Sequence, residues 1–275
     1  MRYILSIICV LTLVACNRVP LEYRLQYFYT SEERAILDSR IEEEIKQMPR
    51  GSLILHSKLD TLIALNPESE PFYTRKALSY TNRGQFQKAF PLIEKSVRLD
   101  PANALYHSCY QMLFTFRDYK RALEDLEFYD DITPGLTYVW GENVNYLKGL
   151  ALKQLGRYDE AVEAFSQCIY EEGRNASEYD YVYRGIANLR HECLEDAASD
   201  FAFAIEQYKN CTMAYVYMGE TKIRQQDYEE AMGYLSKAEE LLCRGIKYTH
   251  PYFEVFDEVQ LDQIYDLMSM CQLEL

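Results

Sequence analysis

Apolar and small residues recur along the chain with helical spacing, and residues 146–169 show the pattern most clearly. Gly156 breaks this run into two stripes, which consist of Tyr146, Gly149 and Leu152 before the break and Tyr158, Ala161, Phe165 and Cys168 (or Ile169) after it. Gly149 has no side chain and that of Ala161 is small, so two helices can cross closely there. Gly156 supplies the chain reversal between them. Because such a helix pair cannot bury both of its faces alone, the pattern predicts further copies.

Five copies of the pattern follow one another. The small residue of the second helix recurs at spacings of 33, 39, 36 and 34 residues, as Ala89, Ala122, Ala161, Ala197 and Ala231. Four residues after it stands Ile93, Leu126, Phe165, Phe201 or Leu235, and twelve residues before it stands Ala77, Tyr110, Gly149, Gly185 or Gly219. A period near 34 with these residues resembles the tetratricopeptide repeat over roughly residues 70–245. The resemblance implies an all-α fold, an α-solenoid (superhelix) of antiparallel helix pairs with a carboxy-terminal capping helix.

The pattern divides the chain into five regions. We expect a cleaved signal peptide at 1–15, a tether at 16–29, a degenerate first repeat or helical cap at 30–69, five repeats at 70–245 and a capping helix at 246–275. The five repeats fall at about 70–103, 103–136, 142–175, 178–211 and 212–245.

Local sequence signals also predict helices before and after the five clear repeats. Thr30 and Glu33 have the spacing of a capping box at the start of a helix over 30–48, and a second helix covers 53–65. Apolar residues on one side, among them Phe253 and Phe256, predict a last helix over about 252–272. The helices of the second repeat should be spread or locally shifted, because Tyr110 and Tyr129 stand where most other copies have small residues.

The first sixteen residues have the organisation of an export signal. A minimal positive start precedes an apolar run, Tyr3–Leu13, that is too short to span a bilayer as a permanent helix. The run ends in Leu13-Val14-Ala15-Cys16, which resembles a bacterial lipobox. The resemblance implies export, cleavage before Cys16 and lipidation of that residue, including acyl chains such as palmitate. An ordinary secretory signal and a buried amino-terminal strand are the alternatives.

The residues after Cys16 indicate to which membrane, and to which side of it, the protein is sent. Asn17 follows the cysteine where some lipoproteins of the inner membrane carry Asp, and no acidic cluster follows. Both features favour a lipid-anchored protein on the periplasmic side of an outer membrane.

The resemblance also implies a binding surface, since the first helices of successive tetratricopeptide repeats line a groove for extended peptides or partner helices. The groove positions carried over to this chain are His107, Gln111, Phe114, Asn143, Tyr146, Lys153, Tyr179, Val182, Ile186, Arg190, Val216, Glu220 and Arg224. Arg190 and Arg224 are suited either to an acidic group of a partner or to a structural role.

Motifs that carry enzyme chemistry are absent from the sequence. The four histidines have no metal-ligand spacing, and no HExxH, phosphate-binding Gly-rich loop or GxSxG occurs. We therefore expect no catalytic residue, metal or cofactor. Beyond Cys16 the sequence leaves open whether any of six cysteines pair, namely Cys109, Cys168, Cys193, Cys211, Cys243 and Cys271.

Charge narrows the class of partner. The chain has 43 acidic and 29 basic residues, a net charge of −14, which repels nucleic acid and anionic lipid surfaces. We therefore expect protein or peptide partners, neutral or basic ones being favoured. The sequence is best interpreted as a membrane-anchored scaffold or adaptor for protein–protein interaction in the bacterial cell envelope. A peptide- or glycan-binding module linked to nutrient handling is the alternative.

Overall fold

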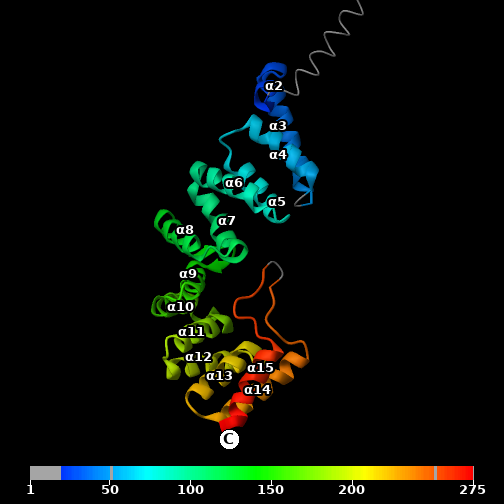
Figure 1. The fold of residues 1–275 in the computed structure, drawn as a ribbon. Coiled ribbons are helices and arrows are strands. Elements are labelled where there is room, and N and C mark those ends of the chain that lie inside the picture. The colour runs from blue at the N-terminus through cyan, green and yellow to red at the C-terminus, as the bar shows by residue number, and fades with distance from the viewer. Residues whose placement is uncertain (1–19, 50–51, 251–252, 275) are drawn as a thin grey trace, which may run out of the picture. The chain divides into compact units, whose positions relative to one another are not determined.

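The computed structural model describes residues 20–49, 52–250 and 253–274, which are folded mainly into helices (Figure 1). Cys16 and the predicted signal peptide lie outside the described residues. The chain divides into two compact units, the first ending at Leu105 and the second beginning at Tyr106. No helix among the described residues is both long enough and apolar enough to cross a bilayer.

The first unit consists of short helices, several of which pack on the next helix in the sequence. They are α2 (Leu21–Phe28), α3 (Ser31–Lys46), α4 (Leu53–Leu65), α5 (Glu70–Thr81), α6 (Phe86–Leu99) and the start of α7 (Pro101–Gln111). The capping box predicted at α3 is present, since Thr30 N donates to Glu33 Oε2 at 2.8 Å and Glu33 N donates to Thr30 Oγ1 at 3.2 Å. The segment predicted to be a tether contains α2, which buries Leu25 and packs on α4.

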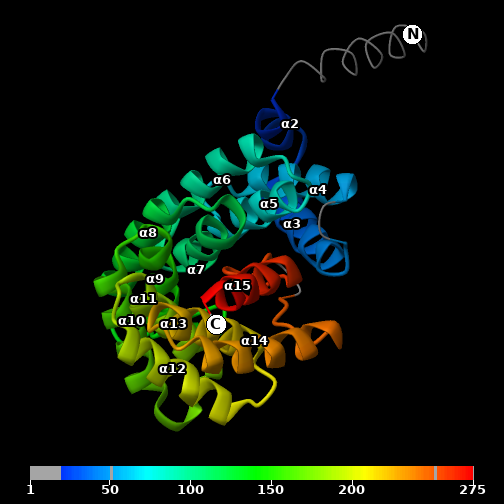
Figure 2. The same ribbon diagram turned by 60° about the horizontal axis from the view of Figure 1, so that its bottom comes forward.

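The second unit continues α7 and adds the remaining elements. They are a π-helical segment (Met112–Phe116), α8 (Tyr119–Ile132), strands β1 (Tyr138–Val139) and β2 (Glu142–Asn143), α9 (Val144–Gln154), α10 (Tyr158–Glu172), a 3-10 turn (Gly173–Asn175), α11 (Glu178–Arg190), α12 (Leu194–Gln207), α13 (Thr212–Arg224), α14 (Tyr228–Cys243) and α15 (Leu261–Glu274). The strands form a single antiparallel hairpin in the longer link before α9. Helix α15 packs on α13 and α14 (Figure 2).

The paired helices cross at the small residues that the sequence pattern identified. A Cβ atom at Gly149 would lie 2.7 Å from the Phe165 ring, at Gly185 2.7 Å from the Phe201 ring, and at Gly219 2.7 Å from Leu235 Cγ. The two residues of each contact are sixteen residues apart in the sequence. The same two repeat positions therefore meet in three successive helix pairs. The predicted all-α array of antiparallel helix pairs is thus confirmed.

The turn between the two helices of each pair contains one residue with left-handed backbone, five residues before the repeat Ala. In two copies it is a glycine, Gly84 with φ of 67° and Gly156 with φ of 74°. The other copies force a side chain into this conformation, at Arg117, Glu192 and Gln226 with φ of 54°, 64° and 64°. The turn geometry is therefore shared even where the favourable residue is not.

The second repeat departs from this regularity as predicted. Tyr110 occupies the position that is glycine in the next three copies, and its ring lies 4.6 Å from Phe114 and 6.1 Å from Trp140. A side chain of that size cannot lie between closely crossing helices, and α7 ends in the π-helical turn Met112–Phe116.

The carboxy-terminal helix is shorter than the sequence pattern predicts. The pattern places its start near residue 252, whereas α15 begins at Leu261. Residues 253–260 lie outside the helix, because their aromatic and acidic side chains are bound by the inner helices of the second unit, as described below.

Candidate binding groove

The first helices of the second unit's pairs hold a non-helical stretch of the same chain. Between α14 and α15 the chain is not helical (Figure 1), and residues 253–257 contact the π-helical segment, α9, α11 and α13. Residues 253–257, called the inner segment below, provide most of the contacts. The helical surface that receives them is called the candidate groove.

Aromatic rings hold one end of the inner segment. Phe253 stacks on Phe114 with ring centroids 3.9 Å apart and lies edge-on to Tyr110 at 5.7 Å. Phe256 lies 5.5 Å from Phe114 and 5.9 Å from Tyr119. Tyr110, Phe114 and Tyr119, which we call the aromatic shelf, therefore hold two rings that are three residues apart.

Polar groups hold the other end. Lys153 from α9 forms an ion pair with Asp257 through Nζ and Oδ2. The hydroxyl of Tyr183 on α11 donates to the Phe256 carbonyl at 3.1 Å, and that of Tyr217 on α13 donates to the Asp257 carbonyl at 3.3 Å. These three residues, called the polar anchor below, bind the segment through two backbone carbonyls and one carboxylate.

Burial decides the chemistry of the polar anchor. The Lys153 side chain is only 4% exposed, and desolvation lowers its pKa while the neighbouring Asp257 carboxylate opposes that shift. Desolvation also raises the pKa values of the Tyr183 and Tyr217 hydroxyls, so both remain protonated donors at neutral pH. The groove therefore has a cation that requires a carboxylate partner and two hydroxyls that require acceptors.

Two further contacts lie nearer to solvent. Arg117 Nη2 pairs with Glu254 Oε2 at 2.9 Å, with side chains 43% and 85% exposed. Tyr179, at the start of α11, stacks on Tyr248 with ring centroids 3.9 Å apart. Of the residues predicted from the sequence for this groove, Phe114, Lys153 and Tyr179 thus contact the returning chain.

The remaining predicted residues of α7 and α9 serve mainly local packing. The His107 ring lies 5.1 Å from Trp140, and Gln111 is half-buried. Asn143 caps α9 by accepting from Asn145 N at 2.8 Å, and its amide donates to Glu171. The buried Tyr146 packs edge-on against Phe165 and Tyr183, at 6.0 Å from each.

The predicted residues of α11 and α13 divide into a buried and a charged set. Val182, Ile186 and Val216 are at most 1% exposed, and therefore no external ligand reaches them in this structure. One residue further along, Tyr183 and Tyr217 reach the inner segment, and the sequence prediction did not include them.

The charged set forms a network within the chain. Arg190 binds Glu220 through Nη1, and Arg224 Nη2 binds the same carboxylate at 3.0 Å. Arg224 Nη1 also donates to the Leu189 carbonyl at 3.2 Å and pairs with Glu192 at 2.6 Å. Both arginines thus have acidic partners from this chain, which favours the structural role among the two that the sequence left open.

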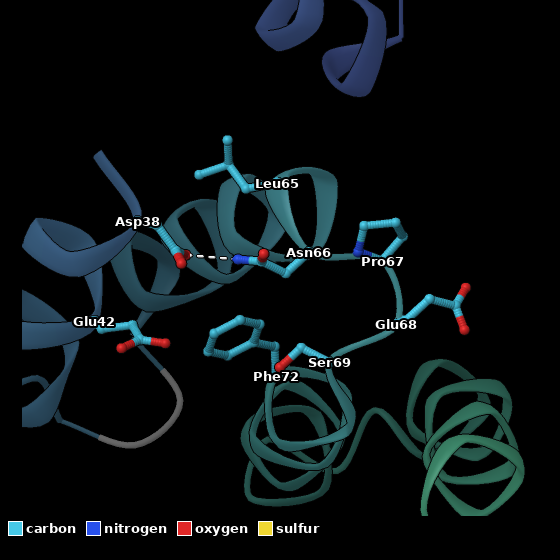
Figure 3. Close-up of a pocket in the computed structure, with 8 residues that line it drawn as sticks. All are labelled: Asp38, Glu42, Leu65, Asn66, Pro67, Glu68, Ser69 and Phe72. Carbon is cyan, nitrogen blue, oxygen red and sulfur yellow. Dashed lines mark hydrogen bonds between the residues drawn. The ribbon is translucent and has the colours of Figure 1, made fainter. Parts of the chain in front are cut away.

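The first unit contains a separate open recess between α3 and the start of α5, with a volume of about 520 Å³ (Figure 3). Asn66 Nδ2 donates to Asp38 Oδ1 across it at 2.8 Å, and Glu42 and Glu68 stand at its edges. Within the described part of the chain, no group of three or more His, Cys, Asp or Glu side chains is arranged to hold a metal ion. The recess is an acidic surface feature.

The six cysteines beyond Cys16 are free thiols. Cys109, Cys168, Cys211 and Cys271 are buried, whereas Cys243 is exposed. The structure therefore has no disulfide between Cys211 and Cys243, which stand near the ends of successive repeats. Burial raises the pKa of the Cys211 thiol to about 12, so it behaves as an apolar side chain.

Comparisons with known proteins agree with this architecture. A family model described as tetratricopeptide repeat matches residues 70–103 and 142–174. No curated protein matches the sequence. Among solved structures, MamA from residue 41 to its end, from Desulfovibrio magneticus RS-1, aligns with a TM-score of 0.56 at 19% identity, over 64% of this chain and 96% of that chain.

A second solved structure is YrrB, described as a TPR protein with an unusual peptide-binding site. It aligns with a TM-score of 0.52 at 22% identity, over 66% of this chain and 91% of YrrB. At these identities the similarity concerns the fold. Together with the family model, it shows that this chain contains tetratricopeptide repeats in an all-α array of antiparallel helix pairs.

Proposed function

We propose that this protein is a protein–protein interaction scaffold, anchored by lipid on Cys16 to the periplasmic side of a bacterial outer membrane, and that the candidate groove binds its partner. The observation that carries the binding role is that the groove accommodates a non-helical stretch of polypeptide, residues 253–257 of this chain. Tyr183 and Tyr217 donate to backbone carbonyls, a contact that any peptide can accept, while the aromatic shelf and Lys153 select side chains. The peptide-binding site in the description of YrrB supports the same use of the fold.

The anchoring part of the proposal rests on the sequence around Cys16. The apolar run before it, the small residue Ala15 and the position of the cysteine together favour lipidation. Several acyl chains hold a protein to a bilayer firmly, whereas one chain holds it only reversibly. In that setting the net charge of −14 favours encounter with neutral or basic protein surfaces and disfavours nucleic acid.

Site-specific photocrosslinking in living cells tests the binding role. A photoreactive residue replaces Tyr179, which lies beside the candidate groove, and in a matched strain it replaces Tyr170 of α10, which is 82% exposed. We expect a defined crosslinked partner from position 179 and none from position 170. Crosslinks from position 170 alone would place binding on the outer helices instead.

Metabolic labelling with an alkyne fatty acid tests the anchor. The unchanged chain should incorporate the label and fractionate with membranes, and Cys16→Ser should do neither. Cys193→Ser is the matched control, because it removes a thiol from a part of the chain that lies among the repeats. Equal labelling of the unchanged chain and Cys16→Ser would refute the anchor while leaving the groove untouched.

A further inference from the structure

The inner segment occupies the candidate groove as a bound peptide would, and its side chains therefore indicate what else the groove binds. It is acidic and aromatic, and its five residues are Phe253, Glu254, Val255, Phe256 and Asp257. We propose that the candidate groove recognises, in a partner protein, a non-helical segment with two aromatic residues three positions apart and a carboxylate directly after the second. Residues 253–257 occupy this site until such a partner replaces them. This inference rests on the proposed scaffold function and specifies its partner.

The aromatic part of the specificity comes from the shelf. Phe114 presents a ring face to Phe253 at 3.9 Å and lies within 5.5 Å of Phe256, so both rings of the ligand share one platform. The two rings come from a short non-helical stretch that bends at Phe253 and turns at Phe256–Asp257. A partner lacking either ring would leave part of this apolar surface exposed to water.

The acidic part comes from Lys153. Its ammonium group lies 5.6 Å from the Tyr183 ring and 5.8 Å from the Phe256 ring, in surroundings that exclude water. A buried cation without a carboxylate is strongly unfavourable, and the carbonyl-binding hydroxyls of Tyr183 and Tyr217 bring no negative charge. The residue after the second aromatic must therefore be acidic. This local requirement contrasts with the neutral or basic partners that the net charge favours, because a single buried cation dominates at the site itself.

The inner segment is held in a way that permits exchange. Among the described residues, no backbone-to-backbone hydrogen bond joins residues 253–259 to the helices, so every hydrogen bond between them involves at least one side chain. The outer ion pair between Arg117 and Glu254 is largely exposed and contributes little. Asp257 has left-handed backbone with φ of 54°, a conformation that is unfavourable for a non-glycine residue. A partner with the same side chains but relaxed backbone at this point would compete effectively.

Fluorescence anisotropy with a defined probe tests the proposal. The probe is a labelled synthetic peptide with the sequence of residues 246–260, and the protein is the full chain, unchanged or carrying Phe253→Ala. Phe253→Ala weakens the internal competitor and leaves the groove intact. Because apparent affinity scales with the fraction of open sites, we expect Phe253→Ala to bind the peptide at least tenfold more tightly than the unchanged chain.

Matched variants identify the site. Adding Lys153→Gln to Phe253→Ala should abolish the gain, and so should a peptide in which the position of Asp257 is Asn. A peptide in which the position of Glu258 is Gln is the control and should bind as before, since Glu258 pairs with Lys247 on its own segment. Should Phe253→Ala fail to fold, as judged by circular dichroism, Asp257→Asn serves as the opening variant, because Asn tolerates the left-handed backbone.

Three outcomes would overturn the proposal. The first is equal peptide binding by the unchanged chain and the opened variants, and the second is no binding by a folded opened variant. The third is a concentration-dependent dimer of the unchanged chain that Phe253→Ala abolishes, which would make a second copy the occupant. Crosslinks from position 179 to another protein would persist in the second case, so failure of this specificity is distinguishable from failure of the scaffold function.

Discussion

The close helix crossing at Gly149 provides the most direct test of the repeat packing. In Gly149→Ala the new Cβ would lie 2.7 Å from Phe165 Cε1 and 2.8 Å from Cδ1 and Cζ. Phe165 is fully buried, and its ring lies 6.0 Å from Tyr146 and 6.3 Å from Tyr183. Because neighbouring rings surround Phe165, its ring cannot move away from the added methyl without displacing them.

A second glycine separates the steric effect from the backbone effect. Gly233 in α14 is exposed, and a Cβ there would meet no atom within 4 Å. Gly233→Ala should stabilise the protein by about 1 kcal/mol, because Ala favours a helix interior over Gly. Gly149→Ala has the same gain in helix propensity, but its added methyl group also costs about 1–3 kcal/mol because it overpacks the helix crossing. The difference between the two variants should therefore equal that penalty.

Urea unfolding followed by tryptophan fluorescence measures this difference. Trp140 is the only tryptophan, and it lies in the same unit as both glycines, 5.8 Å from the Tyr106 ring. We expect the midpoint of Gly233→Ala to rise and that of Gly149→Ala to lie well below it, with similar slopes. If both variants are stabilised equally, the helices of this pair do not cross as closely as described, and the packing argument fails.

Three further predictions concern the turn, pH and thiol reactivity. Gln226→Gly should raise the free energy of unfolding by roughly 0.5–1 kcal/mol, since Gly removes the strain of φ at 64°. An unchanged free energy of unfolding in urea titrations would contradict this. Burial raises the pKa of the Asp180 carboxyl from 3.8 to about 6. The protonated carboxyl therefore contributes stability that is greatest below pH 4 and is lost as the pH rises to 6. Asp180→Asn should remove up to about 3 kcal/mol of that pH dependence in unfolding titrations. With a thiol reagent, Cys243 should react rapidly and the buried Cys211 only on unfolding; equal rates by mass spectrometry would refute the assigned burial.

The repeat architecture could be predicted because its determinants are local and recur. The spacing of Ala161 and its equivalents fixed which helices pair, and Gly149 with its equivalents fixed where they cross. The turn residue was visible only at glycine copies, since Glu192 and Gln226 adopt the same φ without an informative side chain. There the packing of the flanking helices imposes the backbone conformation, and composition does not reveal it.

The groove was predicted only in part, because its lining depends on a one-residue difference in helix orientation. Residues carried over from the family include Phe114 and Lys153, which contact the inner segment, and Val182, which is fully buried. Tyr183 and Tyr217 stand at the same repeat position, 34 residues apart, and this recurrence of a hydroxyl was a signal that the sequence did contain. The start of α15 was not predictable from periodicity, since Phe253 and Phe256 also have helical spacing.

The same spacing is compatible with the non-helical conformation that the segment before α15 adopts. Two rings three residues apart can lie on one face of a helix or on a shared platform, and periodicity does not distinguish these arrangements. The platform has the advantage here because it also supplies what a surface helix lacks, a desolvated cation for Asp257 and two hydroxyls for backbone carbonyls. Forming a helix instead would leave Lys153 buried without a carboxylate, which costs more than the few helical hydrogen bonds return. The non-helical segment and the buried lysine therefore depend on each other, and any other chain that occupies the groove must meet the same requirement.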